Sequence, residues 1–260
     1  LDIGFDLQLF NALDITFDWF RERRSNIFQQ KLSIPNYLGT ANTKIYGNLA
    51  EVINKGVDLA VNYSKRINKD LSIQFQGTFT YNNNEISVYD EAPGKRDAMK
   101  SQGKNVKTVW GYVADGLYID RADIANSPTS TLGNIAIAPG DIKYVDQPDR
   151  EGKYDGRITA DDQVPLGVSV PKIIYGFGPS VGYKNWDFSV FFQGRGNVAL
   201  MLSDIQPFGS SYRRGVLKFI DENHWSPDNQ DPNAKYPRLT DNYNNHNTVS
   251  SSYWLRNGRF

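Results

Sequence analysis

An acid-rich stretch, DREGKYDGRITADD (Asp149 to Asp162), contains the residue types most suited to binding a metal ion. Its Asp155-Gly156 pair, followed by an acid at Asp162, has the spacing of the second half of an EF-hand calcium loop. Such a loop has acids at its first, third and fifth positions, because calcium takes about six to eight oxygen ligands. Counting back from Asp155 puts Lys153 at the third position, where a cation opposes the metal. We therefore interpret the stretch as a tight turn, in which Gly156 permits a left-handed backbone, and expect no metal site.

The sequence lacks the patterns of common catalytic sites. It contains no G-x-S-x-G, P-loop or H-E-x-x-H pattern, so no activated nucleophile, phosphate cradle or zinc protease site is expected. The two histidines, His224 and His246, have no acidic ligand at helical spacing and make a poor zinc pair. A glycosidase needs two carboxylates about 5–10 Å apart across a sugar cleft, and sequence does not show such a distance. We expect neither an enzyme nor a cofactor.

Aromatic side chains are frequent in the irregular parts of the chain. Aromatic faces can stack on sugar rings or anchor a protein interface, because they bury a large area at low entropy cost. The alternative is that the rings pack long loops into a stable rim. The aromatic residues concerned are Trp110, Tyr112, Tyr118, Tyr144, Tyr212, Trp225, Tyr236 and Tyr243. Of these we expect Trp110, Tyr112, Tyr118 and Trp225 to contact a substrate or a partner.

Composition excludes several classes of protein. The 260 residues include 29 basic and 29 acidic residues, so no basic surface indicates nucleic acid. There is no cysteine, which excludes a disulfide framework and thiolate metal sites. The mean hydropathy is −0.54, and no apolar run of about eighteen residues indicates a membrane-spanning helix. A membrane β-barrel remains possible, because it hides its apolar surface in an alternating pattern.

The segment VDLAVNYSKRINKDLSIQFQGTFTY (Val57 to Tyr81) alternates strictly between apolar and polar residues, which predicts a β-hairpin over about 56–82. One face carries Val57, Leu59, Val61, Tyr63, Leu71, Ile73, Phe75, Phe79 and Tyr81. The opposite face carries Asp58, Asn62, Ser64, Ser72, Gln74, Gln76, Thr78 and Thr80. A three-residue turn, Asn68-Lys69-Asp70, would set Tyr63 opposite Phe75 and Leu59 opposite Phe79, and would align the faces.

Two further segments repeat this design, over about 2–20 and 175–194. The first turns through Phe10-Asn11-Ala12, and the second through Lys184-Asn185. The connections between the hairpins, about 21–51, 84–174 and 196–260, are long and show no clean alternation. Compact domains seldom use such loops, whereas outer-membrane barrels combine short turns at one rim with long loops at the other. The aromatic residues near the strand ends suit the interfacial girdles of such a barrel: Trp19, Tyr63, Tyr81, Tyr183 and Trp186.

The fold class we predict for residues 1–260 is all-β: an antiparallel up-and-down transmembrane β-barrel segment with long extracellular loops. Three hairpins supply fewer strands than the about eight of the smallest membrane barrels. A sheet left with two open edges in lipid could not satisfy its backbone groups. We therefore expect the chain to be one part of a larger barrel.

Five phrases in the long connections occur in an order that resembles one known family. The phrases are VWGYVADGLYID, PGDIKYVDQPDREGKYDGRITADDQVPLG, VPKIIYGFGPSVGYKNWDFSVFFQG, HWSPDNQDPNAKYPRL and SSYWLRNGRF. Together they resemble the C-terminal half of SusC/RagA-like TonB-dependent outer-membrane transporters. The hairpin NKGVDLAVNYSKRINKDLSIQFQGTFTYNNNEI resembles the mid-barrel hairpin of the same family.

This resemblance implies a location in the outer membrane and a barrel of about 22 strands with a plugged lumen. It implies uptake of oligosaccharides or peptides, a SusD-like surface lipoprotein as partner, and a TonB-type energy transducer acting through an N-terminal part. Lumen-lining residues would then be Asp58, Asn62, Gln74, Gln76 and Thr78. The competing hypothesis is a secreted β-sandwich binding module or adhesin, in which the apolar faces would be buried against a facing sheet.

Overall fold

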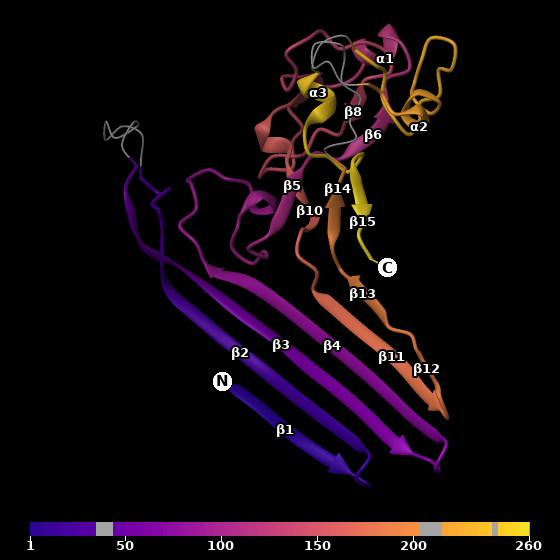
Figure 1. Cartoon of the computed structure of the whole chain (residues 1–260). Coiled ribbons are helices and arrows are strands. Elements are labelled where there is room, and N and C mark those ends of the chain that lie inside the picture. Colours follow the sequence, from indigo (N-terminus) through magenta and orange to yellow (C-terminus); the bar gives the residue numbers. More distant parts are fainter. Residues whose placement is uncertain (35–43, 203–214, 241–243, 260) are drawn as a thin grey trace.

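The computed structural model describes residues 1–34, 44–202, 215–240 and 244–259. It consists of one long sheet and a packed region of loops at one end of that sheet (Figure 1). We name this packed region, formed mainly by residues 108–168, 217–240 and 244–257, the cap. The chain reaches the cap between β4 and β11 and again after β13.

The long sheet is antiparallel and follows chain order, β1-β2-β3-β4-β11-β12, with β13 continuing alongside β11. Each strand is the neighbour of the one before it, so the topology is up-and-down. The bounds of its strands are β1 Asp2–Leu9, β2 Leu13–Gln30, β3 Tyr46–Arg66, β4 Leu71–Val88, β11 Ile173–Tyr183, β12 Trp186–Ser189 and β13 Phe192–Gly196.

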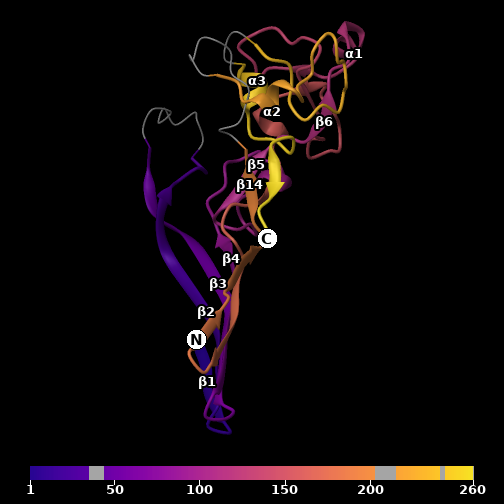
Figure 2. The same cartoon turned by 45° about the vertical axis from the view of Figure 1, so that its right-hand side comes forward.

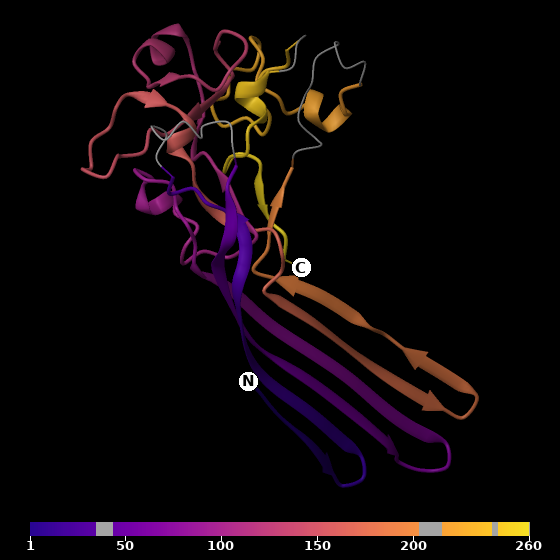
Figure 3. The ribbon, with the colours of Figure 1, turned by 90° about the vertical axis from the view of Figure 1, so that its left-hand side faces the viewer.

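Three short turns lie together at the end of the sheet opposite the cap (Figure 3). Phe10, Asn11 and Lys184 adopt positive φ angles of 54°, 49° and 51°, the left-handed geometry of tight hairpin turns. In the middle turn the side chain of Asn68 accepts hydrogen bonds from the backbone N–H groups of Asp70 and Leu71, both at 2.9 Å. The predicted turns are therefore confirmed.

The predicted register of the central hairpin is also confirmed. Tyr63 pairs with Phe75 and Leu59 pairs with Phe79. The same rows continue into β2, where Phe17 faces Leu59, and into β11, where Tyr175 faces Phe79. Because side chains alternate across a strand, this register gathers the apolar residues on one face of the sheet and the polar residues on the other.

Three strands are longer than the sequence predicted, and one of them, β4, continues to Val88, past the predicted hairpin end at about residue 82. The expected loop 21–51 is paired over much of its length, since β2 continues to Gln30 and β3 begins at Tyr46. A kink at Asn26, whose φ is 59°, accompanies a shift of register and does not end the ladder. Polar residues occupy both faces here, with Arg21 opposite Lys55. The alternation of apolar and polar residues disappears where both faces meet water, but the backbone hydrogen bonds continue. The hydropathy pattern therefore underestimates the length of the strand.

The apolar face of the sheet has no second layer of protein among the described residues. Figure 2 views the sheet close to edge-on, and it is one strand thick. Large apolar side chains of this face remain open, Phe188 with 67% and Phe79 with 37% of its surface exposed, and Val61 is only partly covered. A β-sandwich would have buried them. The described part of the chain contains no helix long and apolar enough to cross a membrane.

The height of the apolar face fits a bilayer. Trp19 and Tyr81 lie in the row that includes Ile173, and Tyr183 and Trp186 form a row near the turns. Strand β11, which joins these rows, is 11 residues long and therefore rises about 35 Å at about 3.3 Å per residue. With a tilt of about 45° it spans about 25 Å, the height of the apolar band of outer-membrane barrels.

The buried core of the described chain lies almost entirely in the cap. Two long connections expected to be irregular, 84–174 and 196–260, pack against each other there around Trp254, Tyr144 and Ile142. The short strand pairs are β5 Thr108–Gly111 with β10 Val164–Val168, β6 Ala114–Leu117 with β8 Ile142–Tyr144, β7 Thr129–Ser130 with β9 Arg157–Ile158, and β14 Ala199–Met201 with β15 Leu255–Asn257. The helices are α1 Arg121–Ala125, α2 Lys218–Asp221 and α3 Asn245–Thr248, with 3-10 turns at Asp97–Met99 and Ala160–Asp162.

The two faces of β3 and β4 predict different responses to a charge. In the full-length protein, Phe75→Arg places a cation on the apolar face between the two aromatic rows and should cost about 2–4 kcal/mol near the bilayer midplane. Leu59→Arg, on the same face but only two residues from the row of Trp19, should cost less. Gln74→Arg, on the polar face of the same hairpin, should be far milder. Unfolding in lipid vesicles measures the difference, and equal tolerance on both faces would mean that the assigned orientation is wrong.

Candidate functional site

The five residues predicted to line a lumen lie together on the polar face of the sheet. Asp58, Asn62, Gln74, Gln76 and Thr78 belong to β3 and β4, and the register places Asn62 beside Gln76. Their neighbours in β2 are also polar, because Asp18 faces Asp58 and Asp14 faces Asn62. The face therefore presents amides, hydroxyls and a band of carboxylates. That this surface borders a passage stays a prediction.

A hollow on the polar face contains an aromatic residue that the sequence pattern did not identify. It is lined by Asn62, Ser64, Gln74, Gln76, Ser180 and Phe191, among others. Phe191 lies over two glycines of β11, and a Cβ atom added to Gly176 or Gly178 would come within 2.7 or 2.8 Å of its ring. These glycines are required for the close approach. The adjacent pair Phe191-Phe192 could have revealed this residue from the sequence. Neighbouring residues of an extended chain point to opposite faces, so one of the two rings must lie on the polar face.

Three of the four aromatic residues expected to make contacts are buried inside the cap. Tyr112, Tyr118 and Trp225 have at most 6% of their surface exposed, and Tyr112 and Trp225 belong to the main apolar core. This corrects the expectation of exposed rings for these three, because packing two long loops together requires a large apolar volume in their middle. Trp110 is only partly buried. Tyr144 and Tyr236 are buried as well, and Tyr212 and Tyr243 lie outside the described residues.

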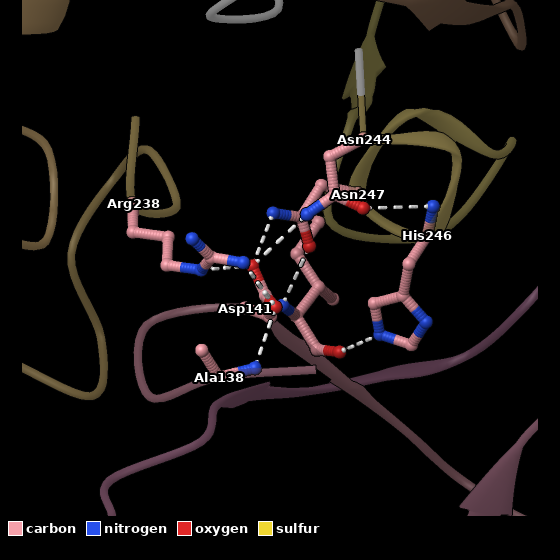
Figure 4. A network of polar contacts seen from close by, with 7 residues as sticks. Ala138, Asp141, Arg238, Asn244, His246 and Asn247 are labelled. Carbon is pink, nitrogen blue, oxygen red and sulfur yellow. Dashed lines mark hydrogen bonds and ion pairs between the residues drawn. The ribbon is translucent and has the colours of Figure 1, made fainter. Parts of the chain in front are cut away.

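A buried carboxylate, Asp141, holds the two halves of the cap together (Figure 4). Arg238 donates to it from Nε at 2.7 Å and from Nη2 at 3.1 Å. The side-chain amides of Asn244 and Asn247 donate at 3.1 and 2.8 Å, and the backbone N–H of Ala138 at 2.9 Å. Asp141 precedes β8, whereas its side-chain partners come from the last part of the chain. All its partners are donors, so its negative charge is compensated without access to water.

His246 belongs to the same region and is held in its neutral form. Its Nε2 lies 2.6 Å from the carbonyl oxygen of Ile142, so Nε2 carries the proton and donates. Nδ1, 3.1 Å from the hydroxyl of Ser130, accepts. Burial lowers the pKa of His246, while the bond to Ile142 and the charge of Asp141 act in the opposite direction and Arg238 adds to the lowering. The histidine therefore serves packing and not metal binding.

Other ionisable groups of the cap also have structural roles. Burial, with the nearby charges of Asp123 and Asp141, raises the pKa of Tyr118 to about 12, so its ring stays neutral. A hydrogen bond from Lys143 lowers the pKa of Asp123, and the two form an ion pair of 2.7 Å. Within the described residues, no group of three or more His, Cys, Asp or Glu side chains is arranged to hold a metal.

No family model matches the chain, but curated relatives do. TonB-dependent receptor P3 of Formosa agariphila is 25% identical over 263 residues, which cover 94% of this chain and 25% of that receptor. TonB-dependent receptor P26 of the same organism is 27% identical over 251 residues, covering 92% of this chain and 24% of the receptor. The chain therefore spans about a quarter of the length of these relatives.

Solved structures share the fold. The RagAB peptide transporter superposes with a TM-score of 0.66 at 18% identity, covering 99% of this chain and 27% of that chain. The RagAB peptide importer in the "open-open" state gives a TM-score of 0.67 at 16% identity, with 99% and 26% coverage. The chain is therefore similar in sequence to TonB-dependent receptors and shares the fold of RagAB.

The similarity to TonB-dependent receptors indicates what each face of the sheet contacts. The strands cross the outer membrane, the apolar face meets lipid, and the long loops that form the cap lie outside the cell. The short turns then lie at the periplasmic rim. The curated relatives are named as receptors and not as enzymes.

We expect the Asp141 cluster to determine the stability of the cap. Asp141→Ala leaves buried donors without an acceptor, and such a loss costs about 3–5 kcal/mol. The lower end applies here, because the side chain of Arg238 retains 21% of its exposure. Protease cleavage of the cap in the full-length receptor, in detergent, measures the loss. Asp115→Ala, which removes an exposed carboxylate of β6, is the control, and equal resistance of the two variants would contradict the role of Asp141.

Acidification should loosen the cap through His246. Its folded pKa lies below the unfolded value of about 6.5, so its contribution is complete above about pH 6.5 and is lost as the pH falls through the folded pKa. Protease cleavage of the cap should therefore accelerate as the pH falls below about 6.5. In His246→Gln, whose amide can donate to Ile142 and accept from Ser130, this part of the pH dependence should disappear. An unchanged pH profile in the variant would exclude His246 as the cause.

Proposed function

We propose that this chain forms part of the wall and the extracellular cap of an outer-membrane importer of nutrients. The observation that carries the proposal is the one-layer sheet. One of its faces is apolar over about the height of a bilayer, and the opposite face presents amides, hydroxyls and carboxylates. A strand of this kind separates hydrocarbon from a hydrated interior. The similarity to two TonB-dependent receptors supports import driven by a TonB-type transducer.

The cargo class we propose is oligosaccharides or peptides, taken up together with a SusD-like lipoprotein. The RagAB peptide transporter and importer share the fold of this chain, and this likeness supports a cargo of this kind. In this proposal Asp58, Asn62, Gln74, Gln76 and Thr78 line the passage. Sugars and peptide backbones both offer many hydrogen-bonding groups, and such a surface can exchange bonds with them at little net cost. Trp110, the predicted contact that is only partly buried, is the remaining aromatic candidate.

A pair of adjacent substitutions tests the passage. Asn62→Trp adds a bulky ring to the polar face of β3, whereas Val61→Trp adds the same ring to the apolar face one residue away. In the full-length receptor we expect Asn62→Trp to reduce uptake several-fold and Val61→Trp to leave it unchanged. Heat-modifiable migration on gels, which reports the folded barrel, shows whether both variants fold.

Growth of a deletion strain tests the activity itself. A strain that lacks the full-length receptor should fail to grow on at least one peptide or oligosaccharide source and should recover on complementation. Unchanged growth on every such source would exclude the importer. Impaired growth with equal uptake in the Asn62→Trp and Val61→Trp strains would keep import and reject the assigned passage.

A further inference from the structure

Two buried carboxylates meet in the turn that joins β8 to β10. Asp146 has 7% and Asp162 has 4% of its surface exposed. Both oxygens of Asp162 accept backbone hydrogen bonds, Oδ1 from Gln147 at 2.8 Å and Oδ2 from Thr159 at 2.6 Å. Oδ2 of Asp146 accepts from the backbone N–H of Gly156 at 2.8 Å. Oδ1 of Asp146 is buried and has no hydrogen-bond partner among the described residues.

The charge of Asp146 is not compensated by any cation of the described chain. Burial raises its pKa, against the hydrogen bond from Gly156. The negative charges of Asp162 and Asp155 raise it further, and so does direct contact with the carboxyl group of Asp162. Nearby basic side chains are engaged elsewhere. Lys153 pairs with Glu151 at 2.7 Å. Arg96 donates to the backbone carbonyls of Pro148, Asp161 and Gln163, and Arg150 to that of Lys95. A buried carboxylate beside a second one, without a counter-charge, requires a proton or a cation.

Sequence spacing argued against a metal because it put Lys153 at the third position of a calcium loop. The path of the backbone removes this objection. Residues 149–153 form a closed excursion, in which the N–H of Asp149 donates to the carbonyl of Lys153 at 2.8 Å. The side chain of Asp149 in turn accepts from the backbone N–H of Lys153 at 2.9 Å. Positions counted along the sequence therefore do not correspond to ligand positions in this turn. The acid that accepts a hydrogen bond from Gly156 is Asp146, which precedes residues 149–153. Lys153 therefore does not occupy the third ligand position of a calcium loop.

We propose that the Asp146–Asp162 turn is a calcium site, with the unpaired Oδ1 of Asp146 as a ligand. Asp162 contributes the second buried carboxylate, and Asp155 the exposed one whose charge reaches Asp146. Calcium accepts backbone carbonyls and water for the rest of its about six to eight oxygens, so three converging acids are not required. A surface pocket opens beside Asp155 and Asp162. Its five acids, which also include Asp149, Glu151 and Asp161, outnumber its three basic residues, Arg96, Arg150 and Lys153. Calcium sites of extracellular modules bind with Kd of about 10⁻⁴–10⁻³ M, a range that suits a cap outside the cell.

Metal-dependent protection of the turn tests the proposal. The full-length receptor in detergent is depleted with EGTA and then titrated with CaCl2, while cleavage within residues 146–162 and the heat of binding are measured. At a free calcium concentration of about 100 times Kd, linkage predicts an about hundredfold smaller open population and correspondingly slower cleavage. Magnesium should protect less, because it demands a near-octahedral site and gives up its water reluctantly.

Two variants and one control make the result specific. Asp146→Asn should abolish protection by calcium, and Asp155→Asn, which changes an exposed residue, should weaken it without affecting folding. Asp115→Asn, which removes an exposed carboxylate of β6 that does not line this pocket, is the control and should respond as the parent does. No calcium-dependent change in the parent, or the same change in Asp146→Asn, would overturn the proposal. The readout concerns the cap alone, so failure here and failure of import are distinguishable.

Discussion

The absence of a protein layer over the apolar face of a one-strand-thick sheet is the constraint on which the rest of this structure depends. Within the described chain, side chains such as Phe79 and Phe188 find no apolar partners from a facing sheet. Each large apolar side chain gains about 1.5–3 kcal/mol from leaving water, so a face of this size cannot remain hydrated. Hydrocarbon supplies the missing environment, and the similarity to TonB-dependent receptors and to RagAB agrees with it.

The same environment places demands on the edges of the sheet. Strand β1 on one side and strands β12 and β13 on the other each leave one row of backbone groups unpaired in the described chain. A bilayer offers no hydrogen bonds to such groups, so a barrel must close through further strands. The observation that the chain spans about a quarter of its curated relatives is consistent with a sector of a barrel. The fold of the sector follows from its solvent, whereas the cap folds as a water-soluble domain does, around a buried aromatic core.

Local features of this protein were predictable from sequence, and long-range ones were not. Turn length and strict alternation together determined the pairing of Tyr63 with Phe75, because a slip of one residue would exchange the faces. The extension of β2 to Gln30 was missed, since hydropathy carries no signal where both faces are wet. The burial of Tyr112, Tyr118 and Trp225 depends on contacts between distant loops. Asp146 was overlooked for a related reason: the excursion at 149–153 separates in sequence what the fold brings together.

The Asp141 cluster has a consequence for the order in which this protein folds. Its partners Asn247 and Arg238 lie 106 and 97 residues further along the chain, whereas each hairpin closes through two or three residues. Closing so long a loop costs conformational entropy before any contact repays it, and topologies rich in distant contacts form slowly. The hairpins can therefore form from local contacts, whereas the cap needs two distant halves that the strands bring to the same rim.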